Sequence, residues 1–272
     1  MTNMLYILAA VIALIILYVL STVGRHSQNG LSPFRGWSFA HRGLHGPGVP
    51  ENSLKAFQAA KDAGYGAELD VHLLRDGNLA VIHDSKLLRC TGVEGVVEEL
   101  TAQQLENYYL EGTQETIPTL ESVLDIFSGS APLIVELKST RENYAQLCEK
   151  VCAVLDNYNG VYCLESFDPR CVFWLRRHRK DQIRGQLTEN YFANPNSKLP
   201  WALKFILTNQ MFNFLTLPDF VAYRFADRKT VSNFLCRRIW RIPGVAWTLT
   251  TPEEYKQAVS EKWIPIFENF IP

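Results

Sequence analysis

The sequence has almost no net charge, which limits the partners that the protein can have. Its 272 residues carry 27 Lys and Arg against 28 Asp and Glu, so the formal net charge is −1 at pH 7. Proteins that bind nucleic acid by neutralising its phosphates carry a basic excess, and we therefore expect no nucleic-acid partner. Internal repeats and low-complexity segments are also missing, and the length suits one large domain with a single core.

The six cysteines lack the spacing of a disulfide framework or of a zinc site. Cys148 and Cys152 lie one helical turn apart, and the sequence contains no CxxC pair. No nearby pair of histidines completes a zinc-binding pattern with them. We expect unpaired thiols in a reducing compartment and no metal site built on cysteine.

Charge is absent from residues 1–24, where Met4 to Leu20 form an unbroken apolar run. This run approaches the roughly 20 residues that are needed to cross a bilayer. A cleaved signal peptide normally has a basic start, which Met1-Thr2-Asn3 lacks, and a shorter apolar core. A core helix rarely has apolar residues on all sides so early in a chain. The sequence predicts a retained transmembrane anchor over residues 1–24 and a tether over residues 25–36.

The anchor has no basic residue before it, whereas Arg25, His26 and Arg35 follow it. The positive-inside tendency therefore predicts a single-pass protein of the cell membrane whose globular part lies in the cytoplasm. The unpaired cysteines favour the same side.

From Trp37 onward, short apolar runs alternate with helical patterns. Eight parallel strands are predicted near residues 38, 67, 134, 162, 184, 221, 246 and 265. Strands that alternate with helices form a parallel sheet with right-handed crossovers, and eight of them predict a (β/α)8 barrel of the TIM type over residues 37–272. A doubly wound open sheet is the alternative, but no Gly-rich phosphate loop follows the first strand. With Pro272 as the last residue, we expect no helix after the eighth strand.

Charged residues gather at the carboxyl ends of the predicted strands, the face where such barrels place their active sites. Glu68 and Asp70 are two residues apart, so both side chains point to one face of their strand. Asp76-Gly77 is a strong hairpin signal, and a two-residue turn there pairs Leu74 with Leu79. The same register places Asp70 directly across from His83. Two carboxylates and an imidazole thus converge on one small volume.

Nine short motifs share an order and spacing that resemble the glycerophosphodiester phosphodiesterase family, in particular its membrane-anchored bacterial members. They are His41-Arg42-Gly43, Glu51-Asn52, Glu68-x-Asp70, His83-Asp84, Thr91-Gly92, Ile117-Pro118-Thr119-Leu120, Glu136-x-Lys138, Ser166-Phe167-Asp168 and Trp247-Thr248. The resemblance covers essentially residues 37–270. It implies a (β/α)8 barrel with an insertion, here residues 85–116. It also implies hydrolysis of glycerophosphodiesters to glycerol 3-phosphate and an alcohol, with a divalent cation as cofactor.

The resemblance also assigns roles to seven residues. It implies an acid–base pair, two phosphate-neutralising cations and three metal ligands: His41 and His83, Arg42 and Lys138, and Glu68, Asp70 and Glu136. The chemistry agrees, because a set of carboxylates suits Mg²⁺ or Ca²⁺ better than zinc. Two histidines that titrate near neutral pH can remove one proton and donate another.

Three further residues leave their roles open. Trp247 is either core filler or a wall of the substrate cleft, and Glu165 is a contact of the metal shell or of glycerol. Glu268 stands near the acid of the family's final Thr-Asp-x-Pro segment, which departs here from the family pattern.

Two alternatives to a soluble-diester hydrolase remain. One is a lysophospholipase D or phospholipase C-like enzyme that acts on lipids, and the other is a non-catalytic, membrane-tethered binding barrel. A barrel without activity would show a broken ligand or histidine, and none of the seven positions is broken. The alternative of a lipid-active enzyme rests on residues 200–217. The sequence predicts that they form one long apolar helix with Lys204 as its single charge. Such a helix either packs on the sheet or lies against the membrane interface and favours lysophospholipid substrates.

Overall fold

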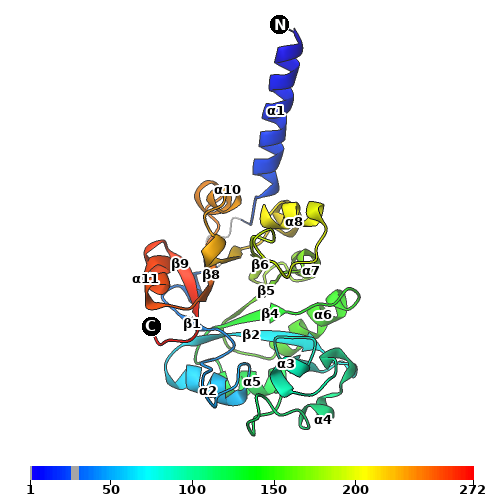
Figure 1. Ribbon diagram of the computed structural model, residues 1–272, viewed down its shortest axis with the longest axis vertical. Helices are drawn as coiled ribbons and strands as arrows, with labels where there is room; N and C mark the ends of the chain where they lie inside the picture. Colours follow the sequence, from blue (N-terminus) through cyan, green and yellow to red (C-terminus); the bar gives the residue numbers. More distant parts are fainter. Residues whose placement is uncertain (1, 26–30) are drawn as a thin grey trace.

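The computed structural model describes residues 2–25 and 31–272, and it confirms the predicted (β/α)8 barrel (Figure 1). The eight parallel strands lie where the sequence predicts them: β1 (Phe39–Ala40), β2 (Gly66–Leu73), β4 (Leu133–Leu137), β5 (Tyr162–Ser166), β6 (Arg184–Thr188), β7 (Phe220–Arg224), β8 (Gly244–Leu249) and β9 (Trp263–Phe267). The barrel closes because β1 pairs with both β2 and β9. A short antiparallel strand, β3 (Leu79–Val81), extends β2 at the edge.

Helices connect the strands on the outside of the barrel. They are α2 (Leu54–Asp62), α5 (Leu120–Phe127), α6 (Tyr144–Leu155), α7 (Pro169–His178), α8 (Trp201–Thr208), α9 (Asn213–Thr216), α10 (Val231–Phe234) and α11 (Pro252–Ser260), with the short helices η3 (Phe225–Asp227) and η4 (Leu235–Ile239). The insertion carries α3 (Leu88–Thr91), η2 (Val97–Glu99) and α4 (Ala102–Leu105) around its own apolar cluster. As expected, residues 268–272 contain no helix.

The bottom of the barrel is filled by large apolar side chains. Phe39, Ile134 and Phe220 lie inside it, fully or almost fully buried. The 3-10 helix η1 (Ser32–Phe34) adds the buried ring of Phe34 to the same cluster. The polar side chains of the site lie beyond this apolar layer, toward the carboxyl ends of the strands.

The predicted hairpin register is wrong by one residue. Val71 pairs with Val81, and the amide of Ile82 donates to the carbonyl of Asp70, so Asp70 faces Ile82 instead of His83. The reason is a three-residue turn in which Gly77, at φ 85°, adopts the left-handed conformation. His83 follows β3 directly and still lines the same cavity as Glu68.

Residues 200–217 do not form the single helix that the sequence predicts, and two further stretches between strands carry only short helices. Residues 200–217 form α8 and α9 rather than one helix, because the chain turns at Gln210, which has φ 55°. Residues 102–109 are helical only over α4, and residues 229–238 divide into α10 and the π-helix η4. None of these breaks contains proline or glycine, the usual sequence signals for a helix end.

Helix α2 begins at a side-chain cap, Ser53. The Ser53 hydroxyl accepts a hydrogen bond from the amide of Ala56 at 3.1 Å and donates to the carbonyl of Pro50. We expect Ser53→Ala to lower the free energy of unfolding by about 1 kcal/mol, the usual cost of losing such a cap. Chemical denaturation measures this effect. The equivalent cap of α11 provides a comparison through Thr251→Ala, and an unchanged stability of both variants would contradict the expectation.

Helix α1 (Thr2–Ser21) projects from one end of the barrel, between α8 and α10 (Figure 1). It is long and apolar enough to cross a membrane, and none of its residues is buried. A signal sequence passes the same test of length and hydropathy. Met1 and residues 26–30 lie outside the described residues. The second range includes His26 and the centre of the predicted tether.

Candidate active site

Three carboxylates form the centre of the site. Glu68 and Asp70 come from β2 and Glu136 from β4, where Asp70 and Glu136 are partners in the parallel register. All three side chains are buried, and ligand oxygens from the three lie within 4.8 Å of one another. Buried carboxylates at this spacing repel one another unless cations lie between them. An oxygen-only donor set of this kind fits a hard divalent cation such as Mg²⁺ or Ca²⁺.

Two basic side chains neutralise part of this negative charge. The Lys138 ammonium lies 3.0 Å from Asp70 Oδ1 and 2.8 Å from Glu136 Oε1. Arg42 lies 3.4 Å from Asp70 through Nε, and its backbone amide donates to Glu68 Oε2 at 3.1 Å. Lys138 follows β4 and Arg42 follows β1, so the two cations contact the carboxylates from the two strands on either side of β2. One polar cavity remains between them.

Burial and these cations divide the acids into two electrostatic classes. Burial raises the pKa of Glu68 well above its usual range, and the charges of Asp70 and Glu136 raise it further. Burial raises the pKa of Glu136 to about 7, although Lys138 opposes it. Burial by itself raises the pKa of Asp70, but the positive charges of Lys138, His83 and Arg42 together hold it well below the usual range. Two groups in the cluster thus favour a proton, and an added cation would stabilise their ionised forms.

Both predicted catalytic histidines face this cavity, and each has a carboxylate on Nδ1. His41 Nδ1 lies 2.7 Å from Glu268 Oε2, and His83 Nδ1 lies 2.6 Å from Asp84 Oδ1. A carboxylate on Nδ1 fixes the tautomer and leaves Nε2 for chemistry. His41 Nε2 lies 3.9 Å from Glu68 Oε2, so this nitrogen points to the carboxylate cluster.

Both histidines favour the neutral form in this structure. Burial lowers the pKa of His83 to about 4, and the positive charges of Lys138 and Arg42 contribute to this shift. Burial also lowers the pKa of His41, although the hydrogen bond with Glu268 opposes the change. Each imidazole can therefore accept a proton without first losing one.

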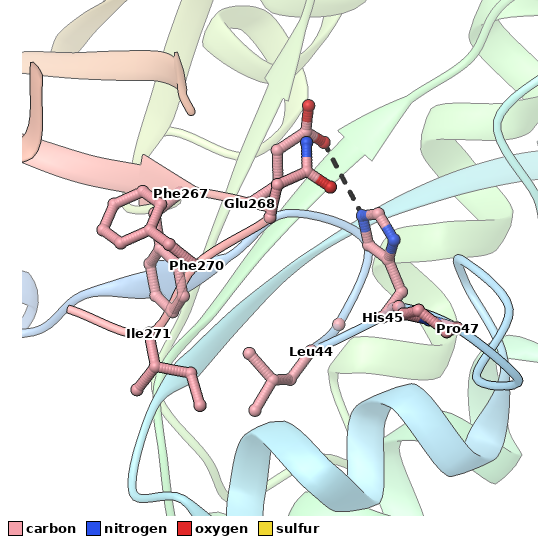
Figure 2. A pocket seen from close by; sticks show the side chains of 10 residues that line it. Leu44, His45, Pro47, Phe267, Glu268, Phe270 and Ile271 are labelled. Carbon is pink, nitrogen blue, oxygen red and sulfur yellow. Dashed lines mark ion pairs between the residues drawn. The ribbon is translucent and has the colours of Figure 1, made fainter. Parts of the chain in front are cut away.

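Glu268 has a second imidazole partner, His45 (Figure 2). His45 Nε2 lies 3.6 Å from Glu268 Oε2, beside a cavity lined by Leu44, Pro47 and Phe270. The hydrogen bonds from His41 and His45 hold the pKa of Glu268 well below its usual range. Sequence reasoning left the role of Glu268 open and did not consider His45. Pairing of β1 with β9 brings them together, because His41 and Glu268 directly follow the paired residues of these strands.

We expect Glu268→Gln to lower kcat/KM by about 10- to 100-fold, because an orienting partner of an acid–base group is lost. The carboxylate of Glu268 raises the pKa of His41, so its removal lowers that pKa further. The limb of the pH–rate profile that belongs to His41 should then move to lower pH, whichever proton it transfers. A profile that keeps its shape would mean that Glu268 does not act through His41.

A chain of ion pairs connects Arg42 to the insertion. Glu51 accepts from Arg42 Nη1 at 3.0 Å and from Arg89 Nη2 at 2.6 Å. Arg89 also contacts Asp84, the partner of His83. The Glu51-Asn52 motif has a second function here, since the Asn52 amide donates to Asp70 Oδ2 at 2.9 Å. The insertion thus holds both Arg42 and, through Asp84, His83 in place.

His72 is a positioning residue that sequence reasoning missed. It is buried on β2, with Nδ1 2.8 Å from Glu98 Oε1 and Nε2 3.3 Å from the carbonyl of His83. Glu98 also accepts from Ser85. The sequence signal for His72 was its position two residues after Asp70, which places both side chains on the same face of β2.

Besides Arg42 Nε, two polar atoms of the cavity wall have no hydrogen-bond partner in the described part of the chain. One is Glu165 Oε2 and the other is Trp247 Nε1, and both atoms are buried. Glu165 pairs with Glu136 across β4 and β5, and Trp247 packs edge-on against Phe167 at 5.4 Å. The cavity they share has a volume of about 100 Å³ and is also lined by His41 and Glu136. An unpaired acceptor and an unpaired donor in one cavity fit a ligand with hydroxyl groups.

The structure therefore places all the predicted site residues around one cavity. Six of them line it directly, His41, Arg42, Glu68, His83, Glu136 and Trp247. Asp70 and Lys138 contact those residues from behind.

Comparisons with known proteins agree with the geometry. Residues 41–260 match the model of the glycerophosphoryl diester phosphodiesterase family. A glycerophosphodiester phosphodiesterase from Bacillus altitudinis is 40% identical over 129 residues, which cover 44% of this chain and 52% of the relative. Glycerophosphodiester phosphodiesterase 1 of Bos taurus is 27% identical over 244 residues, which cover 80% of this chain and 72% of the relative. The matched segment thus spans about half the length of the first relative.

Two solved structures share the fold. A phosphodiesterase from Oleispira antarctica, in complex with the product sn-glycerol-3-phosphate, superposes with a TM-score of 0.71 at 21% identity, over 88% of this chain and 94% of that chain. A glycerophosphodiester phosphodiesterase from Thermotoga maritima has a TM-score of 0.63 at 24% identity, over 85% and 93%. At these identities the likeness is one of fold.

Proposed function

Because the chain belongs to the glycerophosphoryl diester phosphodiesterase family, we propose that it hydrolyses glycerophosphodiesters to glycerol 3-phosphate and an alcohol. The observation that carries the proposal is the pairing of two carboxylate-held histidines with a three-carboxylate cluster in one cavity. The family generally depends on a divalent metal, and Glu68, Asp70 and Glu136 would hold it here. The cation, Mg²⁺ or Ca²⁺, would neutralise charge on the phosphate and acidify a nearby hydroxyl group.

The protein side chains supply the remaining steps. Arg42 and Lys138 neutralise the other phosphate oxygens, the arginine through two parallel N–H groups and the lysine as a point charge. One of His41 and His83 removes the proton of the attacking hydroxyl as a new P–O bond forms. The other donates a proton to the alkoxide as its P–O bond breaks. When the attacking hydroxyl is that of water, the products are a phosphate monoester and an alcohol, and the proton taken from water equals the proton given to the alkoxide.

Glu165 and Trp247 complete the proposal by binding the glycerol part of the substrate. The carboxyl group accepts from one hydroxyl and the indole N–H donates to another, which satisfies both unpaired atoms. Phe167 and Leu187 cover the apolar carbon atoms beside them.

We expect Glu165→Leu to raise KM by about tenfold, because a buried hydroxyl of the substrate loses its acceptor. Glu165→Gln keeps an acceptor oxygen and should retain most of the affinity. Steady-state kinetics with glycerophosphocholine separates the two variants. If both variants instead lose metal affinity to the same degree, Glu165 is a metal ligand and the assignment to glycerol is wrong.

The function itself is tested with the purified full chain. After removal of metals by EDTA, glycerophosphocholine should be stable, and added Mg²⁺ or Ca²⁺ should restore release of glycerol 3-phosphate. Hydrolysis at the same rate without metal would contradict metal dependence. Absence of hydrolysis with either metal would favour the non-catalytic barrel.

The proposal includes retention of α1 as a membrane anchor over residues 1–24, followed by the tether 25–36 and the barrel domain 37–272. Its support is the contact between the carboxyl end of α1 and the barrel. Trp240 Nε1 donates to Val19 O and Thr22 Oγ1 at 3.1 Å, and the Tyr18 hydroxyl donates to Asn209 Oδ1 at 3.1 Å. Removal of α1 as a signal sequence would leave these barrel groups without their partners.

We also propose that the barrel faces the cytoplasm. The described cysteines are all buried, so the test uses an exposed reporter, Ser260→Cys on α11. An impermeant thiol reagent applied to intact cells should leave this residue unlabelled and should label it after lysis. Labelling of intact cells would place the barrel outside. Extraction of the protein by alkaline carbonate would contradict the anchor.

A further inference from the structure

A group of exposed apolar side chains surrounds the carboxyl end of α1. On one side Phe192, Trp201 and Phe205 form an aromatic cluster, in which the rings of Trp201 and Phe205 stack at 5.5 Å and Phe192 packs edge-on against Trp201. On the other side lie Val231, Phe234 and Ile239. All six are exposed, Trp201 to 70% and Val231 to 64%. We call these six residues the collar.

Elements that carry the collar are attached to α1 by hydrogen bonds. Asn209, directly after α8, accepts from Tyr18, and Trp240, directly after η4, donates to the last turn of α1. Cys236 within η4 donates to the carbonyl of Thr22 at 3.5 Å. Figure 1 shows α8 and α10 on opposite sides of the end of α1, while α2 and the insertion lie at the far end of the barrel. The helix and the two collar segments therefore form one joint.

The collar segments are also basic. Residues 192–216 and 229–241 contain no Asp or Glu, and their charged side chains are Lys198, Lys204, Lys229, Arg237, Arg238 and Arg241. In a protein with net charge −1, this is a marked local excess of positive charge. Exposed aromatic and aliphatic side chains beside lysine and arginine are typical of surfaces that lie in a membrane interface.

Helix α8 differs from an ordinary barrel helix in its burial. Thr208 is its only buried residue, although the helix is almost entirely apolar. A barrel helix that faces water keeps a broad polar side. Exposure of this surface to water is unfavourable by about 25 cal/mol per Å² of apolar area, so a cover of lipid stabilises it.

We propose that the collar is a second membrane contact, which holds the barrel against a bilayer that contains anionic lipids. The proposal rests on retention of α1 as an anchor. With α1 across the bilayer, the collar lies at the level of the headgroups because its segments are fixed to the end of that helix. Phe192 follows the last residue of β6 by four positions, so this part of the collar lies in the loop after the carboxyl end of that strand. Diesters with a lipid chain, including lysophospholipids, then reach the cavity from the membrane surface.

Tryptophan fluorescence in vesicles tests the collar without using activity. The full chain is placed in vesicles of phosphatidylcholine and phosphatidylglycerol with brominated acyl chains, which quench indoles at the interface. Of the six tryptophans, Trp201 belongs to the collar and Trp240 is bonded to the end of α1, so Trp201→Phe should remove roughly half of the quenched signal. Trp174→Phe, on α7 and packed against the core, is the matched control and should leave the signal unchanged.

Charge reversal tests the choice of lipid. Arg238→Glu with Arg241→Glu should reduce the quenching of Trp201 in mixed vesicles to the level seen in vesicles of phosphatidylcholine alone. Lys150→Glu with Lys256→Glu, on α6 and α11, provides the control. Equal quenching in the Trp201 and Trp174 variants, in protein that stays with the vesicles, would refute the collar and leave the anchor intact. Protein that washes off the vesicles would refute both.

Discussion

Replacement of His41 or His83 by Ala should lower kcat by about 10²- to 10⁴-fold, the usual contribution of a general acid or base. The two imidazoles lie in the loops after β1 and β3, and each is held by its own carboxylate through Nδ1. Neither can replace the other, because one proton must leave the nucleophile while another reaches the leaving alkoxide. We expect the double variant to be little slower than either single one, since groups that act as a unit give non-additive losses.

The control for this series is His178→Ala, an exposed histidine on α7. It should retain full activity. Two small losses that add in the double variant would contradict acid–base roles and would indicate that the histidines only position the substrate. Circular dichroism on each variant separates these outcomes from loss of the fold.

Glu68→Gln should abolish turnover and, at the same time, stabilise the metal-free protein. Burial and the neighbouring carboxylates raise the pKa of Glu68 above its value in the unfolded chain. This shift opposes folding at any pH above the pKa that Glu68 has in the unfolded chain, and the cost disappears as pH falls to that pKa. A neutral amide of the same shape removes that cost. It also removes ligand oxygen, so added Mg²⁺ or Ca²⁺ should no longer raise the melting temperature.

The metal-free melting temperature and its increase with metal are two independent readouts of this variant. Glu149→Gln makes the same chemical change at an exposed position on α6, and it should alter neither. A Glu68→Gln protein that keeps the metal-dependent increase would show that Glu68 is not a ligand. Retained turnover under metal-limited conditions would contradict the whole cluster.

The sequence predicts the parts of this molecule that depend on neighbouring residues. Short runs rich in apolar residues locate most of the strands, and the two-residue spacing of Glu68 and Asp70 places both on one face. The cap of α2 at Ser53 is equally local. These features follow from backbone geometry within one element, and no knowledge of the neighbouring elements is needed.

Features that depend on contacts between distant segments could not be predicted in the same way. The bond between His41 and Glu268 joins residues 227 positions apart, and it exists because β9 closes the barrel beside β1. The hairpin register depends on the conformation of Gly77, since Asp-Gly suits both a two-residue and a three-residue turn. The break between α8 and α9 is set by packing of Gln210 against Asn233, which leaves no mark in the local sequence.

The joint between α1 and the barrel has a consequence for how substrate and enzyme meet. A catalytic domain on a loose linker would sample a hemisphere above the membrane. Hydrogen bonds from Trp240 and Cys236 to the last turn of α1 instead fix the barrel at one angle and one height. With α1 in a bilayer, the encounter becomes a search by lateral diffusion in two dimensions. Turnover of a lipid diester would then depend on the number of molecules per unit of membrane area, and dilution of the vesicles at constant composition would leave it unchanged.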